Sequence, residues 1–226
     1  MMKIKMPNVP MLLAMVTVVA VTAVTASCAG GGHASASATQ NTGLVTIRVS
    51  QYRGDVVTPS RGKPDIVLTD TSGQRYDLRA MTAGQVTLLF FGYTHCPDEC
   101  PLTMSETGVA LRDLTPAEQA KIRVVFVTVD PVRDTGPVLR RWLDQFDPAF
   151  IGLTGTLHAI EVAANAAGIP VGNPIRQPDG SYQLDHGTEM LVFSTDNRAH
   201  LAFFPSTSPA NMAHDLKLLV TGHHPG

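Results

Sequence analysis

The chain has 226 residues, 44% of them hydrophobic, and carries a formal net charge of −2. This apolar content supports the core of one domain with an appendage, whereas the near-neutral charge lacks the basic surplus that phosphate-backbone binding needs, so no nucleic-acid partner is expected. Three cysteines are too few for a small disulfide-stapled scaffold, and their odd number suggests that one has a separate role.

The N-terminus has the order of charge, apolar run and small residues that is typical of an export signal. Lys3 and Lys5 precede an apolar run over residues 11–24, and a small-residue segment ends at Cys28. The run is shorter than the roughly 20 residues that span a bilayer, which favours a cleaved signal peptide over residues 1–27. Because the segment before Cys28 resembles a bacterial lipobox, we expect this cysteine to be lipidated; ordinary cleavage with an incidental cysteine is the alternative.

The next segment is expected to be a tether. Residues 29–43 are almost all Gly, Ala, Ser, Thr, Asn and Gln, a composition that cannot bury enough apolar surface to offset the entropy of ordering. Residues 28–43 therefore form a lipidated, flexible connection. The remaining residues, 44–226, are expected to form one extracytoplasmic domain that is lipid-anchored to the cell membrane.

From residue 44 onward, strand-like and helix-like segments alternate. Continuous apolar runs predict buried central strands at 86–92 and 122–129. Further strands are predicted at 44–49, 65–69, 151–153, 171–176, 182–185, 189–194 and 200–204. Helices are predicted at 101–114, after the Thr-Pro-Ala-Glu signal of 115–118, at 135–146, at 157–167 and from Pro209 onward. This order predicts an α/β, thioredoxin-like fold with a mixed central sheet flanked by helices and a β-hairpin insertion.

Two cysteines lie four residues apart, where the first buried strand gives way to a helix. The free N–H groups and the dipole at a helix N-terminus favour a thiolate, so Cys96 and Cys100 are candidates for chemistry. Such a pair can cycle between dithiol and disulfide, or bind a soft cation such as Cu(I). A structural disulfide is the alternative, although closing so short a loop stabilises little. Two cysteines and one histidine would leave a structural zinc site incomplete.

Eight histidines could supply a third ligand. His186 is the leading candidate because it ends a predicted strand before a glycine, where a loop over the active end of the sheet would begin. His95 adjoins Cys96 and could tune it electrostatically. The other six are expected to be surface, capping or solvent groups: His33, His158, His200, His214, His223 and His224.

The stretch FGYTHCPDECP at residues 91–101 closely resembles the signature of the Sco/SenC proteins, thioredoxin-fold copper chaperones that serve cytochrome c oxidase assembly. The resemblance covers about residues 52–220. It also includes LTD at 68–70 with Gly73, VTVDP at 127–131 with RDT at 133–135, FIGLTG at 150–155, and Asp185-His186.

This resemblance implies a copper site with Cys96, Cys100 and His186 as ligands. It also implies delivery of copper to the binuclear copper site of cytochrome c oxidase subunit II, with an upstream copper donor as a further partner. Asp130 would lie near the site, behind the ligands or as an occasional ligand. A loop cap before Pro131 is the alternative for this residue.

Two other function classes remain open. The same thiols could reduce the target's cysteines, which would make the protein a thiol–disulfide oxidoreductase and an enzyme. A metal-free, peroxidase-like or general disulfide reductase of the thioredoxin superfamily is the third class. Substitution of His186 separates them, because it should abolish Cu(II) binding by a chaperone and leave dithiol exchange mostly intact.

Overall fold

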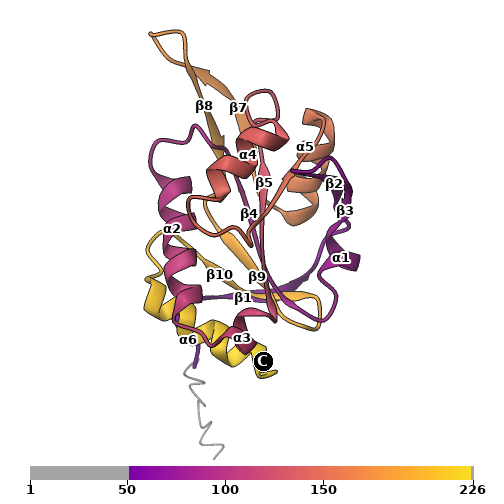
Figure 1. Cartoon of the computed structure of the whole chain (residues 1–226), viewed down its shortest axis with the longest axis vertical. Coiled ribbons are helices and arrows are strands. Elements are labelled where there is room, and N and C mark those ends of the chain that lie inside the picture. Colours follow the sequence, from indigo (N-terminus) through magenta and orange to yellow (C-terminus); the bar gives the residue numbers. More distant parts are fainter. Residues whose placement is uncertain (1–50, 225–226) are drawn as a thin grey trace, which may run out of the picture. The chain divides into compact units, whose positions relative to one another are not determined.

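Two parallel strands, buried almost throughout, form the centre of the fold (Figure 1). In the computed structural model, which describes residues 51–224, strand β4 (Val86–Gly92) pairs in register with β5 (Ile122–Thr128). Both strands are apolar over most of their length, as strands covered on both faces require. The prediction of two central strands is confirmed, and the cysteine loop leaves the sheet at the carboxyl end of β4.

Within residues 51–224, eight strands form one mixed sheet in the order β1-β10-β9-β4-β5-β6-β2-β3. Strand β6 pairs with β5 in parallel. The pairings of β1 with β10, β10 with β9, β9 with β4, β6 with β2 and β2 with β3 are antiparallel. The strands that flank the central pair are β1 (Asp55–Gly62), β2 (Val67–Asp70), β3 (Arg75–Asp77), β6 (Ile151–Thr154), β9 (Met190–Phe193) and β10 (Arg198–Phe203). The strand pair predicted at 189–194 and 200–204 is therefore present as β9 and β10.

The helices pack against this sheet and against one another. They are α1 (Leu78–Met81), α2 (Glu99–Arg112), α3 (Pro116–Gln119), α4 (Gly136–Leu143), α5 (Leu157–Ala167) and α6 (Pro209–Val220). Helices α2 and α6 lie side by side, α4 packs against β6, and α5 lies against β2 (Figure 1). The start signal at α3 is a capping box between Thr115 and Glu118. The predicted α/β fold, a mixed central sheet flanked by helices, is confirmed.

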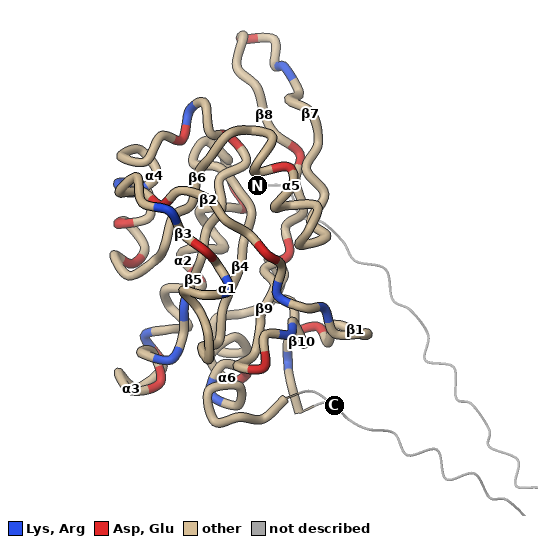
Figure 2. Tube along the Cα trace, turned by 90° about the vertical axis from the view of Figure 1, so that its right-hand side faces the viewer, with Lys and Arg blue, Asp and Glu red and all other residues tan. Residues whose placement is uncertain are grey.

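A separate hairpin carries one of the candidate site residues. Strands β7 (Val171–Arg176) and β8 (Tyr182–His186) form a two-stranded sheet of their own and extend beyond the main sheet (Figures 1 and 2). Gly180, at φ +85°, supplies the left-handed turn residue between them. The predicted hairpin insertion is confirmed.

Three short or exposed elements were not predicted. Strand β1 is mostly exposed and contains Pro59, so it lacks the apolar alternation that signals a strand. Strand β3 and helix α1 have three and four residues, too few for a periodic pattern. Helix α2 begins two residues earlier than predicted, and α4 ends three residues earlier.

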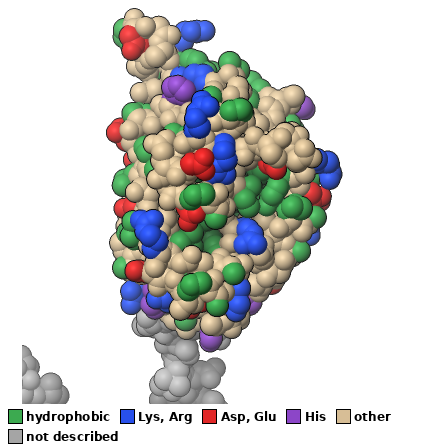
Figure 3. Space-filling view, viewed as in Figure 1, with side chains coloured by type: hydrophobic (Ala, Val, Ile, Leu, Met, Phe, Trp, Pro, Cys, Tyr) green, Lys and Arg blue, Asp and Glu red, His purple; other side chains and the backbone are tan. Residues whose placement is uncertain are grey.

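Charged side chains are spread over the domain. Basic and acidic positions are interspersed along the chain in Figure 2. On the face seen in Figure 3, apolar, basic and acidic side chains are likewise mixed, and neither sign of charge forms a continuous patch there. Surface charge on this face therefore does not single out a binding site.

Several sequence predictions fall outside the described residues. They are the signal peptide at 1–27, the lipidated Cys28 with the tether to residue 43, His33, and the strand at 44–49. Within residues 51–224, no helix combines the length and the apolar character needed to cross a membrane.

Candidate metal centre

The loop between β4 and α2 positions both thiols. Cys96 lies in this loop and is partly exposed, whereas Cys100 lies in the first turn of α2 and is fully buried. The backbone N–H of Cys100 donates a hydrogen bond to the Cys96 sulfur at 3.4 Å. The Cys96 sulfur therefore occupies the N-terminus of α2, where free N–H groups and the helix dipole favour a negative charge. Both cysteines are free thiols.

The glycine at the end of β4 makes room for the buried thiol. A Cβ atom on Gly92 would lie 2.8 Å from the Cys100 sulfur and 2.9 Å from the Phe90 ring. Real Cβ atoms do not approach other atoms so closely, so any larger residue would displace the sulfur or the ring. Gly92 thus permits the close approach of strand and helix on which the position of Cys100 depends.

His186 brings an imidazole from β8 to the thiols. Its Nε2 atom lies 3.5 Å from the Cys100 sulfur, and its Nδ1 atom is 2.8 Å from the backbone carbonyl of Gly187. Because a carbonyl oxygen only accepts, Nδ1 carries the hydrogen, and in the neutral ring the lone pair of Nε2 faces the sulfurs. The imidazole makes T-shaped contacts with the Phe90 and Tyr93 rings, which fix the ring plane.

Together these three residues form what we call the Cys-Cys-His group: Cys96, Cys100 and His186. Their sulfur and nitrogen atoms all lie within 4.8 Å of one another. Within the described part of the chain, no other cluster of three His, Cys, Asp or Glu side chains has this proximity. Two sulfurs and an imidazole nitrogen are ligands that copper prefers, so the donor set fits a copper ion.

The two thiols differ strongly in acidity. A hydrogen bond from the Cys100 thiol lowers the pKa of Cys96 to about 4, and the contact with His186 adds to this effect although burial opposes it. The same thiol–thiolate contact, together with burial, raises the pKa of Cys100 well above its usual range. Burial alone would lower the pKa of His186, but its contact with Cys96 raises it overall. Near neutral pH, Cys96 is therefore a thiolate beside a protonated Cys100.

Asp130 is not part of the Cys-Cys-His group. Its carboxylate is 3% exposed. It forms an ion pair with Arg133 and accepts a hydrogen bond from the Tyr182 hydroxyl at 2.9 Å. The backbone N–H of Arg133 also approaches it at 3.5 Å. The structure thus contains contacts typical of a supporting residue as well as the cap-like backbone contact.

The other described histidines are not part of the Cys-Cys-His group. His95 is exposed and contacts the Thr94 hydroxyl at 3.0 Å. His200 is only 12% exposed, and its ring pairs with Asp196 at 2.8 Å. The remaining four residues of this set are exposed or partly exposed: His158, His214, His223 and His224.

Sequence reasoning missed a second buried carboxylate. Asp134 is 0% exposed and accepts hydrogen bonds from the Thr94 N–H (2.9 Å), the Thr94 hydroxyl (2.6 Å) and the Thr128 hydroxyl (2.7 Å). The sequence signal that could have identified Asp134 is its position, as an acidic residue shortly after the end of a buried strand. No comparable signal marked Tyr182, whose role depends on contacts across 52 residues.

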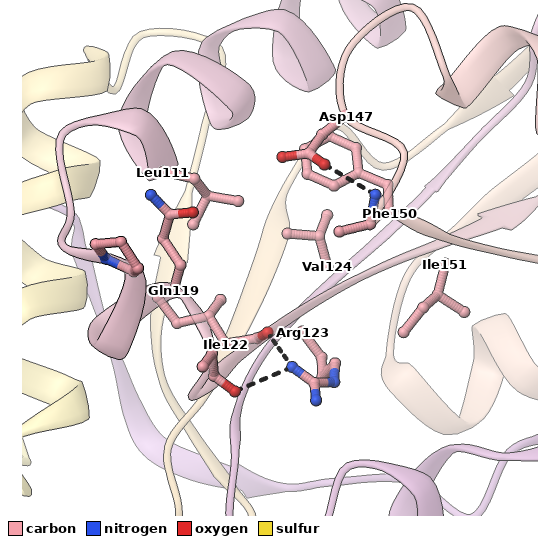
Figure 4. Close-up of a pocket in the computed structure, with 11 residues that line it drawn as sticks. Leu111, Gln119, Ile122, Arg123, Val124, Asp147, Phe150 and Ile151 are labelled. Atoms are coloured by element: carbon pink, nitrogen blue, oxygen red, sulfur yellow. Dashed lines mark hydrogen bonds between the residues drawn. The ribbon is translucent and has the colours of Figure 1, made fainter.

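Two surface pockets are candidate sites. The larger, about 520 Å³, lies among Leu111, Val124 and Phe150 (Figure 4). Its Arg123 guanidinium donates to the carbonyls of Ala120 and Ile122, and no cysteine or histidine lines it. The smaller pocket, about 230 Å³, is lined by Cys96 and His186. The reactive groups therefore open into the smaller pocket.

Comparisons with known proteins show which family the chain resembles. The family model SCO1/SenC matches residues 57–221. The SCO2-like protein of Rickettsia felis is 30% identical over 154 residues, which cover 68% of this chain and 74% of the relative. The mitochondrial protein SCO2 homolog of Danio rerio is 34% identical over 137 residues, covering 60% of this chain and 48% of that protein. The chain thus spans about half the length of this mitochondrial relative.

A solved structure of a similar protein supports the description of the fold. Bradyrhizobium japonicum ScoI with copper bound has 33% sequence identity and a TM-score of 0.63, and the match covers 70% of this chain and 99% of that one. The predicted thioredoxin-like fold is confirmed by this likeness. The chain belongs to the SCO1/SenC family, a thioredoxin-fold family of copper-binding proteins involved in cytochrome c oxidase assembly.

Proposed function

We propose that this protein binds copper through Cys96, Cys100 and His186 and delivers it to the binuclear copper site of cytochrome c oxidase subunit II. The observation that carries the proposal is the convergence of two sulfurs and one imidazole nitrogen within 4.8 Å. The copper-bound structure of a relative with 33% identity supports the choice of metal. An upstream protein that donates copper is part of the same proposal.

The chemistry of the site suits copper as a transferable cargo. Thiolates and imidazole together accept Cu(I) and can also hold Cu(II). A three-ligand set leaves space for an incoming ligand, and the site faces a pocket on the surface, so the acceptor can approach. Cys100 must lose its proton to become a ligand, because only the thiolate binds metal well. Copper uptake is therefore expected to release a proton.

The proposal includes an extracytoplasmic, membrane-anchored location. Cleavage after residue 27 would leave Cys28 as a lipidated N-terminal residue on a flexible connection. The mass of the mature protein from the membrane fraction tests this directly, since a lipidated cysteine adds the mass of its acyl groups. The variant Cys28→Ala should appear in the soluble fraction, and unchanged membrane retention would contradict the lipid anchor.

The decisive experiment measures copper content and the visible spectrum after Cu(II) loading. We expect about one copper per chain and a charge-transfer band from thiolate to copper, absent from a Cys96→Ser/Cys100→Ser control. Copper should then pass to the isolated copper-binding domain of subunit II when the two proteins are mixed. Loading without the band would contradict the ligand assignment, and a loaded protein that gives no copper to this domain would contradict delivery.

A second candidate function follows from the unequal thiols. A thiolate at Cys96 beside a protonated, buried Cys100 is the arrangement of an attacking and a resolving cysteine. The Cys96 thiolate would attack a target disulfide, forming a mixed disulfide and releasing one target thiolate. Cys100, once deprotonated, would attack the Cys96 sulfur and release the second. Two electrons thus pass to the target as the Cys96–Cys100 disulfide forms.

Trapping distinguishes this reductase activity. The variant Cys100→Ser should accumulate the mixed disulfide with a target protein, whereas the reduced wild type should convert one target disulfide per chain. Absence of both results, under conditions where copper transfer proceeds, would exclude the reductase function.

A further inference from the structure

We propose that residues 130–134, between β5 and α4, set the distance between the thiols and the imidazole by bonding to both halves of the site. One half is the loop that carries the thiols, and the other is strand β8, which carries the imidazole. We call residues 130–134 the brace segment. Its two carboxylates, Asp130 and Asp134, are 3% and 0% exposed. Each bonds to a different half. The effect on copper binding rests on the proposed function, whereas the positioning itself is a property of the metal-free protein.

The first carboxylate holds the strand that carries the imidazole. The Tyr182 hydroxyl donates to Asp130 at 2.9 Å, and Asp130 is in turn paired with Arg133. The Arg133 guanidinium lies 3.8 Å from the centre of the Tyr182 ring, a distance typical of a cation–π contact. One of its nitrogens also approaches the Tyr182 carbonyl at 3.4 Å. Tyr182 begins β8, and His186 ends it.

This attachment matters because β8 has no place in the main sheet. Strands β7 and β8 pair with each other and form a separate two-stranded sheet, and an isolated two-stranded hairpin is marginally stable in water. Its position relative to β4 and α2 must therefore come from other contacts. Those of Tyr182 with Asp130 and Arg133 act at its first residue, and a weaker bond joins the Leu184 N–H to the Tyr93 hydroxyl at 3.4 Å.

The second carboxylate holds the loop that carries the thiols. Asp134 accepts hydrogen bonds from the backbone N–H of Thr94 at 2.9 Å and from its hydroxyl at 2.6 Å. Thr94 lies two residues before Cys96. The Thr128 hydroxyl, at the end of β5, also donates to Asp134 at 2.7 Å. The start of the cysteine loop is thereby fixed to the central sheet.

The two halves are joined within a single turn of backbone. The N–H of Asp134 donates to the carbonyl of Asp130 at 2.9 Å, so the two carboxylates cannot move apart independently. Burying two carboxylates costs free energy unless each is fully paired, and even a paired buried carboxylate often adds little to the stability of the fold. Here both are paired with the parts of the chain that carry the Cys-Cys-His group, which accounts for their presence as a positioning device.

Two conservative variants test the halves separately in the metal-free, reduced protein. Tyr182→Phe removes one hydroxyl and keeps the ring on Arg133, and Thr94→Val removes one hydroxyl and keeps the backbone bond to Asp134. We expect Tyr182→Phe to speed amide hydrogen exchange in β8 about tenfold or more. Thr94→Val should instead speed exchange at Cys96, whose N–H bonds to the Tyr93 carbonyl. Ile175→Thr, at an exposed position of β7, is the matched control and should change neither.

Copper provides the second readout. Each of the two variants should weaken Cu(II) binding about tenfold and shift the thiolate-to-copper band, whereas Ile175→Thr should match the wild type. A merely structural role would lower the thermal midpoint and leave the spectrum of the folded, loaded protein unchanged, which would overturn the proposal. Unchanged exchange in β8 of Tyr182→Phe would also overturn it, whatever copper does. A wild type that takes up no copper would contradict the proposed function, while exchange would still decide the positioning.

Discussion

The Nε2 atom of His186 lies 3.5 Å from the sulfur of Cys100, although 86 residues separate them in the chain. His186 ends strand β8 of the separate hairpin, and Cys100 lies in the first turn of α2, which follows the central strand β4. This contact adds an imidazole nitrogen to a pair of thiols. The function of the protein should therefore respond differently to loss of the imidazole and to loss of a thiol.

His186→Ala should abolish tight Cu(II) binding and leave dithiol exchange largely intact. The variant removes the one nitrogen of the group, so the loss should exceed the roughly 10- to 100-fold typical for a residue that only supports a ligand. Copper affinity by competition with a chelator measures the first effect, and reduction of a model disulfide measures the second. His158→Ala is the matched control, because this histidine is exposed in the first turn of α5 and is not part of the Cys-Cys-His group. Equal copper affinity in the His186 variant and the wild type would show that the ligand assignment is wrong.

Cys96 should react with iodoacetamide at a rate that hardly changes between pH 6 and 9. Its pKa of about 4 keeps it a thiolate over this whole range. The reactivity of an ordinary thiol instead rises about tenfold for each unit by which the pH increases toward its pKa. Mass spectrometry of the metal-free protein, alkylated in short pulses, measures the rate at each pH. A rate that rises steeply through pH 8 would contradict a stabilised thiolate.

The same measurement on Cys100→Ser tests the cause. The hydrogen bond from Cys100 is the largest influence that lowers the pKa of Cys96. A serine hydroxyl at this position sits on a shorter bond and reaches the Cys96 sulfur less well. The alkylation profile should therefore move to higher pH in this variant, and an unmoved profile would assign the effect to the helix N-terminus and His186 instead.

The position of the thiols could be predicted from local sequence. A continuous apolar run followed by two cysteines and a helical pattern places them at the carboxyl end of a buried strand and the start of a helix, and the structure has this arrangement. Such features depend on residues close together in the chain. The same holds for the capping box at Thr115 and for the hairpin turn at Gly180.

The supporting contacts could not be predicted in this way. The bond from Tyr182 to Asp130 spans 52 residues, and that from Thr94 to Asp134 spans 40. No periodicity connects such residues, because their proximity depends on how the hairpin and the loop pack on the sheet. Strand β1 was missed for a related reason: it lies at the edge of the sheet, pairs with β10 alone in the described structure, and is mostly exposed.

Gly92→Ala should damage both the fold and the site. The new methyl group would lie 2.8 Å from the Cys100 sulfur, and overpacking of this kind costs about 1–3 kcal/mol. We expect that loss in the free energy of unfolding, with weaker copper binding because the sulfur must move. Gly62→Ala is the matched control, since no atom lies within 4 Å of its added carbon. Equal unfolding curves for the two variants would mean that strand and helix are less closely packed than described.

A buried lysine gives the domain a measurable pH dependence. Lys63 is 3% exposed and donates to the hydroxyls of Thr82 and Thr87 at 2.9 and 3.0 Å. Burial, aided by the nearby Arg79, lowers its pKa from 10.5 to about 8. Between pH 8 and 10.5 the unfolded chain therefore binds more protons at this residue than the folded chain, so the free energy of unfolding rises with pH through this window.

Comparison with Lys63→Met isolates this effect, because other titrating groups are shared. The free energy of unfolding of the wild type minus that of the variant should increase by about 2–3 kcal/mol between pH 7 and 10. Denaturant titrations of the reduced, metal-free protein at each pH provide the values. The same comparison with Lys217→Met, at an exposed position of α6, should show no increase. A flat difference for Lys63→Met would mean that the lysine keeps its ordinary pKa in the folded state, with water reaching its ammonium group.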